Sequence, residues 1–127
     1  MKALIVDDVK GWRTYHSSVI KNIFPDIEII EADSAENAYN LILEQNLSPF
    51  DLIITDMQME TKFEPLYAGE WLIEQIKTLN NYIKTKIVII SGAYNINYVA
   101  EKYDCSYIRK ATAQNFPDSY NFIKEIL

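Results

Sequence analysis

Short apolar runs alternate with stretches of helical periodicity along the whole chain. The runs are short enough, and bounded by enough polar or turn-forming residues, to be typical of buried strands. They predict five strands, at residues 2–6, 27–31, 51–56, 86–90 and 105–109. Apolar residues that recur at spacings of three and four predict helices at about residues 10–24, 34–46, 69–79, 95–102 and 116–127.

Several of these boundaries have local causes. Pro25 ends the first helix, because a proline cannot continue the helical hydrogen-bond ladder. Ser34 has the character of an N-cap for the second helix. Residues 86–90 form a nearly continuous β-branched run, which is typical of a strand that is covered on both faces. Residues 105–109 are more polar, so we expect them to form an edge strand.

The alternation predicts an α/β fold, with a doubly wound, five-stranded parallel sheet and helices on both faces. Spacing alone does not determine the order of the strands. A chain of 127 residues can bury one core, and it shows no repeat and no linker. We therefore expect a single domain over residues 1–127, with no output domain. The residues leave open whether this is a stand-alone protein or a piece of a longer one.

Composition narrows the class of protein. The net charge is −6, from 12 basic and 18 acidic residues, which argues against direct binding of nucleic acid. No apolar run approaches the roughly 20 residues that span a bilayer, and no leader pattern is present. The single cysteine, Cys105, rules out an internal disulfide and fits a reducing compartment. We expect a cytoplasmic protein without membrane insertion.

Polar residues follow the predicted strands at the edge where ligands bind in open α/β sheets. They are Asp7, Asp8, Asp56, Ser91 and Lys110. Crowded carboxylates repel one another, and a hard divalent cation such as Mg²⁺ relieves that repulsion through oxygen ligands. A lysine and a serine nearby would bind phosphate oxygens, and a carboxylate can itself be the nucleophile that forms an acyl phosphate.

Each of these residues also has a simpler interpretation. A single aspartate after a strand is most often a turn or cap residue, and a lone serine or lysine there means little. The combination on four strand ends favours a phosphoryl site. The one histidine, His16, cannot make a metal site by itself, and we expect it at the surface or boundary of the first helix.

Four segments together resemble the receiver domain of two-component response regulators. They are Leu4-Ile5-Val6-Asp7-Asp8, Asp56, Ile89-Ile90-Ser91-Gly92-Ala93 and Tyr107-Ile108-Arg109-Lys110, and they fall in the right order and spacing over the full chain. Arg13, the Glu31–Ala35 stretch and Gly69 agree with the resemblance. The resemblance implies a flavodoxin-like fold with strand order 2-1-3-4-5.

The same resemblance implies roles for the site residues. A histidine kinase or a histidine phosphotransfer protein would donate a phosphoryl group to Asp56. Asp8, Asp56 and the backbone carbonyl of Gln58 would hold Mg²⁺ directly, while Asp7 would act mainly through water. Ser91 would move to bond the phosphoryl group and Tyr107 would turn inward, which switches the face made by helix 4, strand 5 and helix 5.

The chain departs from the family pattern at two places. Ala111 follows Lys110, where the family usually has a proline and often a cis peptide. Since a cis bond before a non-proline residue costs about 2.5–4 kcal/mol, we predict a trans link with a shifted strand–helix loop, or a strained link. The segment 57–68 holds twelve residues, where most strand-to-helix loops need about two to six. We expect this insertion to cover Asp56 in part or to contact a partner.

Tyrosines gather around the fourth and fifth predicted helices. Tyr94, Tyr98 and Tyr103 are candidates for a face that binds a partner or a second copy of the chain.

Three other functions are alternatives to a phosphorylated receiver. A degenerate receiver would bind partners without phosphorylation. A haloacid-dehalogenase-like phosphatase needs Asp-x-Asp, but Val9 follows Asp8. A flavin-binding protein needs a phosphate-binding loop where Asp7 and Asp8 stand. The full acidic set with Ser91 and Lys110 favours the phosphorylated receiver.

Overall fold

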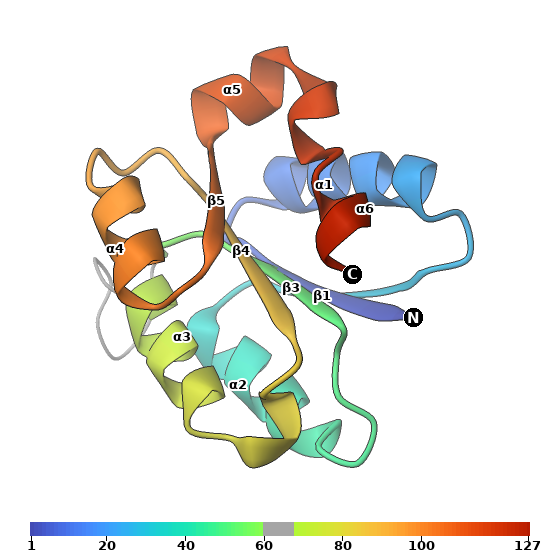
Figure 1. Ribbon diagram of the computed structural model, residues 1–127, viewed down its shortest axis with the longest axis vertical. Coiled ribbons are helices and arrows are strands. Elements are labelled where there is room, and N and C mark those ends of the chain that lie inside the picture. Colours follow the sequence, from blue (N-terminus) through green and yellow to red (C-terminus); the bar gives the residue numbers. More distant parts are fainter. Residues whose placement is uncertain (60–67) are drawn as a thin grey trace.

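A computed structural model describes residues 1–59 and 68–127, and its centre is a five-stranded sheet (Figure 1). All neighbouring strands are parallel and their order is β2-β1-β3-β4-β5. The strands are β1 (Lys2–Val6), β2 (Glu28–Ala32), β3 (Leu52–Thr55), β4 (Lys86–Ser91) and β5 (Ser106–Arg109). The predicted doubly wound α/β fold, the strand order 2-1-3-4-5 and the edge position of the last strand are confirmed.

Helices follow the strands and agree with prediction for the first four. The α-helices are α1 (Lys10–Ile23), α2 (Ala35–Glu44), α3 (Ala68–Lys77), α4 (Ile96–Lys102), α5 (Lys110–Asn115) and α6 (Ile123–Ile126), with 3₁₀ turns η1 (Asn80–Tyr82) and η2 (Pro117–Tyr120). The predicted N-cap is confirmed, since the Asn37 N–H donates to Ser34 Oγ at 3.1 Å. Within the described residues, no helix is both long and apolar enough to cross a membrane.

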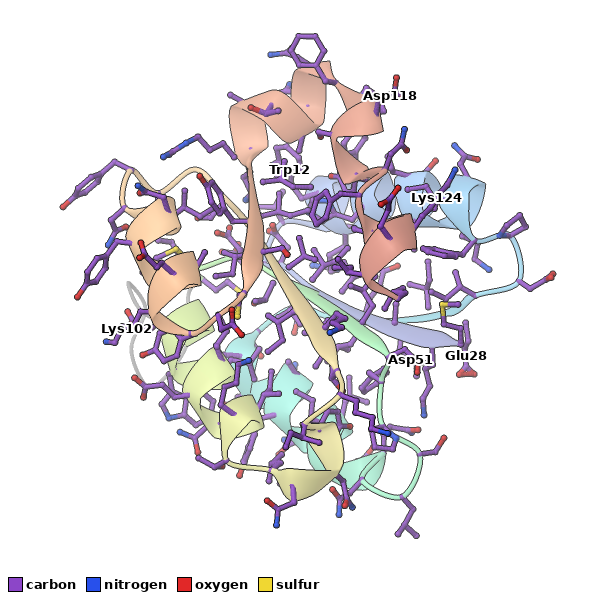
Figure 2. The ribbon with its side chains drawn as sticks, viewed as in Figure 1. Trp12, Glu28, Asp51, Lys102, Asp118 and Lys124 are labelled. Atoms are coloured by element: carbon purple, nitrogen blue, oxygen red, sulfur yellow. The ribbon has the colours of Figure 1, made fainter. Side chains whose placement is uncertain are left out.

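The alternation of side chains along each strand divides the core into two layers. Leu4 and Val6 of β1 face α2, α3 and α4, and Ala3 and Ile5 face α1, α5 and α6. The two groups of helices lie on opposite faces of the sheet in Figure 1, and apolar side chains fill the space between (Figure 2). Because both faces are covered, the inner strands are apolar at nearly every position.

The single last helix that we predicted over residues 116–127 is wrong. The structure has α5, η2 and α6 there, and α5 begins at Lys110, directly after β5. Pro117 causes the interruption, because it disfavours helical geometry at the preceding residue, and Phe116 has φ −134° and ψ 87°. The described residues contain no cis peptide, so the link from Lys110 to Ala111 is trans, and the expected intervening loop is absent.

The predicted position of His16 at the surface or boundary of the first helix is also wrong. Its side chain is 1% exposed, and its Nδ1 lies 2.6 Å from the Tyr120 hydroxyl of η2, with which it is hydrogen-bonded. The helical pattern of α1 does place His16 on the side that carries Val19 and Ile20, but its polar partner is 104 residues away in the sequence. Burial, together with the nearby charge of Lys110, lowers the pKa of His16 to about 3.

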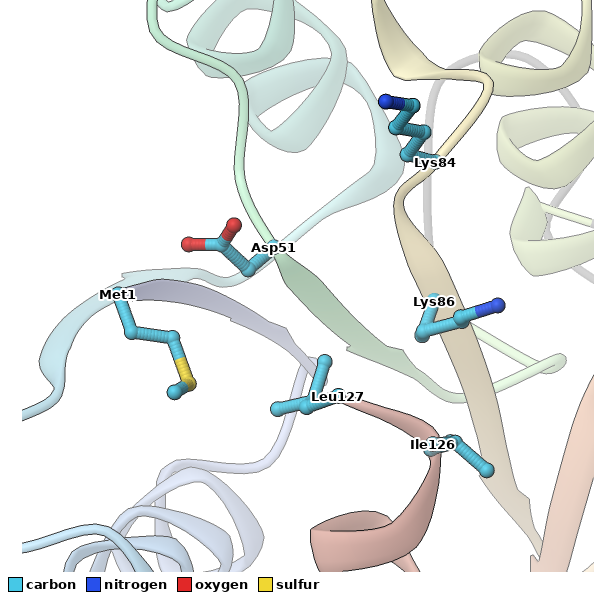
Figure 3. Close-up of a pocket in the computed structure, with 6 residues that line it drawn as sticks. All are labelled: Met1, Asp51, Lys84, Lys86, Ile126 and Leu127. Atoms are coloured by element: carbon cyan, nitrogen blue, oxygen red, sulfur yellow. The ribbon is translucent and has the colours of Figure 1, made fainter.

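A cavity of about 240 Å³ lies at the amino-terminal edge of the sheet (Figure 3). It is lined by Met1, Asp51, Lys84, Lys86, Ile126 and Leu127. Asp51 and Lys86 stand at the starts of β3 and β4. The candidate chemistry, in contrast, follows the ends of the strands, so this cavity is no part of that site.

We predict that His16 makes the protein less stable as the pH falls. The unfolded chain takes up the proton near pH 6.5, whereas the folded chain takes it up only near pH 3. The stabilising effect is therefore complete at neutral pH and is lost below about pH 6.5, at about 1.4 kcal/mol per pH unit. Urea unfolding of the wild type and of His16→Gln over this range measures the difference in slope.

Carboxylates titrate in both proteins, so only the difference between the two profiles reports on His16. Because it is the one histidine of the chain, its imidazole resonances also give the pKa directly by NMR. Parallel stability profiles, or a titration of the wild-type imidazole near pH 6.5, would contradict the prediction.

Candidate functional site

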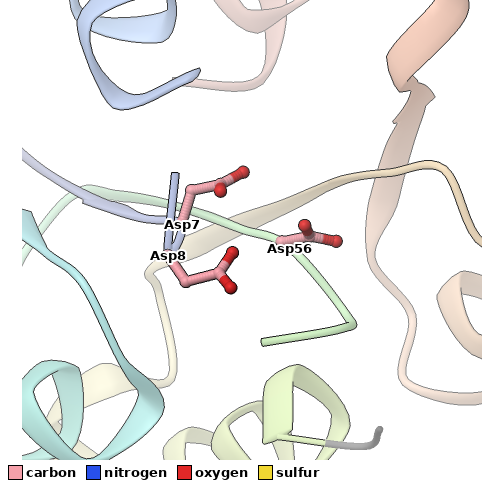
Figure 4. A group of neighbouring side chains, drawn as sticks. All are labelled: Asp7, Asp8 and Asp56. Carbon is pink, nitrogen blue, oxygen red and sulfur yellow. The ribbon is translucent and has the colours of Figure 1, made fainter. Parts of the chain in front are cut away.

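Three carboxylates meet at the carboxyl edge of the sheet, as the sequence predicts. Asp7 and Asp8 follow β1 and Asp56 follows β3, and one oxygen from each lies within 4.8 Å of the others (Figure 4). Asp7 and Asp56 are buried, whereas Asp8 is exposed. The pairing of β1 with β3 brings these aspartates together, although they are about fifty positions apart in the sequence.

Lys110 points into this cluster from the start of α5. Its Nζ lies 2.7 Å from Asp56 Oδ2 and 3.1 Å from Asp7 Oδ2. Ala111 in place of the usual proline therefore does not prevent the lysine from reaching the acidic residues. A single ammonium group thus faces two buried carboxylates, and it partly neutralises the charge that their proximity creates.

Each buried aspartate uses its other oxygen to shape the turn after its strand. Asp7 Oδ1 accepts a hydrogen bond from the Val9 N–H at 2.9 Å. Asp56 Oδ1 accepts one from the Met57 N–H at 2.7 Å and another from the Gln58 N–H at 3.3 Å. The turn interpretation is therefore confirmed for one oxygen of each carboxylate, and the other oxygen faces Lys110, where its role in a phosphoryl site stays a prediction.

The pKa shifts follow from burial and from these neighbours. Burial raises the pKa of Asp7, although the Val9 N–H and Lys110 oppose the shift. For Lys110, burial acts to lower the pKa, but the hydrogen bonds and charges of Asp56 and Asp7 outweigh it and raise the pKa. Lys110 consequently stays protonated at neutral pH and keeps its positive charge at the site.

Arg13 of α1 supports the loop that carries the first two aspartates. Its Nη1 donates to the Asp7 carbonyl oxygen at 2.8 Å, and its Nε is paired with Glu31 Oε1 at 3.1 Å. These two contacts of the Arg13 side chain link the end of β1 to β2 on one side of the site. Arg13 and Glu31 therefore help to fix the backbone at Asp7 without adding a charge inside the cluster.

The predicted switch residues lie on β4 and β5. Ser91 is fully buried, and its Oγ accepts a hydrogen bond from the Ala93 N–H at 3.1 Å. Tyr107 is 42% exposed, with the Arg109 guanidinium 6.0 Å from the centre of its ring. In this structure, therefore, the tyrosine faces solvent in part. The switching roles of Ser91 and Tyr107 stay predictions.

The predicted partner face is uneven. Tyr94 and Tyr98 are exposed, at 90% and 65%. Tyr103 is partly buried, and its hydroxyl oxygen lies 3.0 Å from Glu70 Oε1 and 2.5 Å from Glu74 Oε1, so its one proton is donated to one or the other carboxylate and joins the end of α4 to α3. Only the first two tyrosines thus offer largely free rings. The function of this face is untested and stays a prediction.

The donor set fits a hard divalent cation. It consists of carboxylate oxygens alone, which Mg²⁺ prefers. Asp7 Oδ2 is buried and makes no directed hydrogen bond among the described residues, although it is paired with Lys110. Asp7, Asp8 and Asp56 are the residues that could hold the ion. The predicted ligand role of the Gln58 carbonyl remains a prediction.

Gly69 is required for the close approach of α3 to the loop that begins at Asp56. A Cβ at this position would lie 1.9 Å from the Asp56 carbonyl oxygen and 2.6 Å from Met57 Cα. The Gly69 N–H also donates to the Met57 carbonyl oxygen at 3.0 Å. Most of the predicted 57–68 insertion, residues 60–67, lies outside the described residues. The expectation that it covers Asp56 or contacts a partner therefore stays open.

Comparison with known proteins decides the family. The family described as "Response regulator receiver domain" matches residues 3–114. The chain belongs to this family. Receiver domains act in two-component signalling and interact with histidine kinases, and they are not catalytic enzymes in the usual sense. A search of curated protein sequences finds no match.

Solved receivers share the fold at low sequence identity. The chemotaxis response regulator CheY4 of Vibrio cholerae is 19% identical, with a TM-score of 0.77, covering 99% of this chain and 98% of its own. The phosphorylated cyanobacterial phytochrome response regulator RcpA is 19% identical, with a TM-score of 0.80 and coverages of 98% and 91%. A mutant receiver domain of the histidine kinase CKI1 from Arabidopsis thaliana is 21% identical, with a TM-score of 0.76 and coverages of 98% and 88%.

Sequence reasoning missed one residue of this receiver site. Trp12 of α1 is half-buried, and the Lys110 Nζ lies 5.0 Å from the centre of its ring. Its position four residues after Asp8, in the first turn of a helix that starts at the carboxyl edge, was an available signal.

We predict that Gly69→Ala destabilises the protein by about 3 kcal/mol, the upper end of the usual cost of overpacking. The added methyl group would collide with backbone atoms, which cannot move aside as a flexible side chain can. Urea unfolding measures the loss. Gly11→Ala is the matched control, since nothing lies within 4 Å of its Cβ and the alanine should stabilise α1 by up to about 1 kcal/mol. Equal stability of Gly69→Ala and wild type would contradict the close approach.

Proposed function

We propose that this receiver accepts a phosphoryl group on Asp56 from a histidine kinase or a histidine phosphotransfer protein. The observation that carries the proposal is the Lys110 ammonium, 2.7 Å from Asp56 Oδ2 inside a cluster of three carboxylates. A carboxylate with a paired cation and two acidic neighbours is suited to phosphoryl transfer. The cation, and a divalent ion held by the acidic neighbours, would neutralise the negative charge on the phosphoryl oxygens.

In the proposed step, a carboxylate oxygen of Asp56 forms a bond to phosphorus. The bond from phosphorus to the donor breaks at the same time: the P–N bond of a phosphohistidine, or the P–O bond of acetyl phosphate. The leaving group keeps the bonding electrons, and Asp56 becomes an acyl phosphate. The amides of Met57 and Gln58 hold the carboxylate plane, so the nucleophile is already oriented before the donor arrives.

Mg²⁺ is the proposed cofactor, held by Asp8, Asp56 and the Gln58 carbonyl, with Asp7 acting mainly through water. When bound, it would neutralise charge on the phosphoryl oxygens. Lys110 binds a phosphoryl oxygen from the opposite side of the site. The Ser91 Oγ accepts the Ala93 N–H, and among the described residues its hydroxyl proton has no acceptor, so it would donate to another phosphoryl oxygen.

The proposed output is a change of the face formed by α4, β5 and α5. The phosphoryl group adds negative charge and acceptor oxygens, to which Lys110 and Ser91 respond. Movement of Ser91 would leave space into which Tyr107 turns, and its partly exposed position here is the expected starting state. Partners, or a second copy of the chain, would then bind the altered face. This is a population shift between two pre-existing states.

A degenerate receiver that binds partners without phosphorylation is the alternative. Two departures from the family pattern favour it, Ala111 in place of the usual proline and the long segment 57–68. The contact of Lys110 with Asp56 counters the first, since the lysine reaches the acidic cluster over a trans link. Most of the second lies outside the described residues. The haloacid-dehalogenase-like phosphatase has no remaining support, because the chain belongs to the receiver family.

We predict that incubation with Mg²⁺ and acetyl phosphate adds one hydroxylamine-labile phosphoryl group to the wild type. Asp56→Asn should show no adduct, because an amide cannot form the acyl phosphate. Intact-mass analysis measures both. A chelator in place of Mg²⁺ should abolish the adduct, and Asp8→Asn should weaken Mg²⁺ binding by at least about tenfold in calorimetry.

Asp26→Asn is the charge-matched control for Asp8→Asn, since Asp26 is exposed in the connection between α1 and β2. It should retain both the adduct and the Mg²⁺ affinity of the wild type. If no adduct forms on the wild type and no Mg²⁺ binds, the proposal fails and the degenerate receiver becomes the better description.

We predict that any self-association induced by acetyl phosphate depends on the two exposed tyrosines. Tyr94→Ser with Tyr98→Ser should abolish it, because the double variant removes the largest free rings of the α4 face. Light scattering after gel filtration measures the association. Leu47→Ser is the control, since Leu47 is 98% exposed and lies beyond the end of α2, away from this face. Unchanged association of the double variant would contradict a role for these tyrosines.

A further inference from the structure

The Lys110 ammonium has a third neighbour besides the two carboxylates. It lies 5.0 Å from the centre of the Trp12 ring, and its side chain is only 18% exposed. Figure 2 shows Trp12 beneath α5, near the junction of β5 and α5. The ammonium is therefore enclosed by Asp7 and Asp56 on one side and by an indole on another.

This contact differs in kind from the two ion pairs. Tryptophan has the ring that attracts cations most strongly, and shielding from water strengthens the attraction. An ammonium group has three N–H donors, of which Asp56 and Asp7 engage at most two. The indole attracts the charge without offering a lone pair to it. It can therefore hold the lysine near the site and leave a donor for an incoming phosphoryl oxygen.

The backbone at Lys110 does little to fix the position of the Lys110 side chain. Lys110 is the first residue of α5, a helix of six residues, and the next residue is the exposed Ala111. A lysine side chain has a flexible four-carbon stem and loses rotamer entropy when it is fixed. Its position must therefore be set by contacts of the side chain, and among the described residues the Trp12 ring is a contact that does not depend on the charge state of the carboxylates.

Trp12 is itself held firmly between helices. Its ring packs edge-on against Tyr15 at 5.8 Å and lies 5.4 Å from the ring of His16. The Tyr15 hydroxyl donates to the Ala113 carbonyl oxygen of α5 at 2.6 Å, and His16 is bonded to Tyr120. The indole thus has a fixed place relative to α5, the helix that starts with Lys110.

We propose that Trp12 is a positioning residue for Lys110, and that its aromatic face keeps the ammonium directed at the phosphoryl end of the site. The inference rests on the proposed phosphorylation of Asp56, which it deepens. When a phosphoryl group and Mg²⁺ occupy the carboxylate oxygens, both ion pairs of Lys110 change. The cation–π contact persists through this change and keeps the lysine within reach of the transferred group.

The test compares Trp12→Leu with Trp12→Phe. Leucine removes the aromatic face, and phenylalanine restores it in part. We expect Trp12→Leu to form the Asp56 adduct with acetyl phosphate about fivefold more slowly, and Trp12→Phe to recover at least half of the lost rate. The Mg²⁺ affinity from calorimetry should change less than twofold in both, because both variants leave Asp7, Asp8 and Asp56 in place. Trp71→Leu, on α3, is the control for loss of a tryptophan and should keep the wild-type rate.

A second readout does not depend on phosphorylation. In ¹H–¹³C NMR spectra, the Lys110 ε-protons of the wild type should be shifted upfield by the indole ring current. They should return to ordinary lysine values in Trp12→Leu, and Lys110→Arg provides the assignment. Ordinary values in the wild type would overturn the contact itself.

The two proposals fail in different ways. Absence of an adduct on the wild type overturns the proposed function, and the positioning role with it, even if the ring-current shift is present. A normal rate for Trp12→Leu beside an active wild type overturns the positioning role alone. An equal loss of rate in Trp12→Leu and Trp12→Phe would also overturn it, since the residue would then act by its volume and not by its aromatic face.

Discussion

The crowding of Asp7, Asp8 and Asp56 within 4.8 Å is the constraint on which the rest of the site depends. Two of these carboxylates are buried, so water screens their repulsion poorly and a positive charge must lie beside them. Lys110 provides that charge from the far end of the chain. The helix α5 starts at Lys110 and contacts α1, and this arrangement places the positive charge of Lys110 beside the two buried carboxylates.

The carboxylates are also structural parts of the loops that carry them. One oxygen of each buried aspartate accepts backbone N–H groups of the following turn, and the other faces Lys110. A substitution at Asp56 therefore alters both the chemistry and the local turn. Asparagine is the suitable replacement because it retains an acceptor oxygen for the turn and removes the charge.

The fold itself followed from periodicity. Apolar runs and helical spacing predicted the five strands and the first four helices, because each pattern marks the face of a strand or a helix that is buried in the core. The single last helix that the apolar spacing predicts is wrong, because Pro117 interrupts helical geometry within that spacing. The buried state of His16 depends on Tyr120, and no local pattern indicates a partner 104 residues away.

The sequence by itself determined the α/β class, the residues at the strand ends and the receiver resemblance. Those features depend on residue order and on short-range spacing alone. The tertiary structure decided which of these residues touch. Only the packing of α1 against α5 and η2 brings Trp12 to Lys110 and His16 to Tyr120. The close approach of α3 to the loop that begins at Asp56 leaves no room for a Cβ at position 69, and this too is decided by the tertiary structure. Such contacts join segments that are far apart in the chain, so their physical cause is the shape of the folded core.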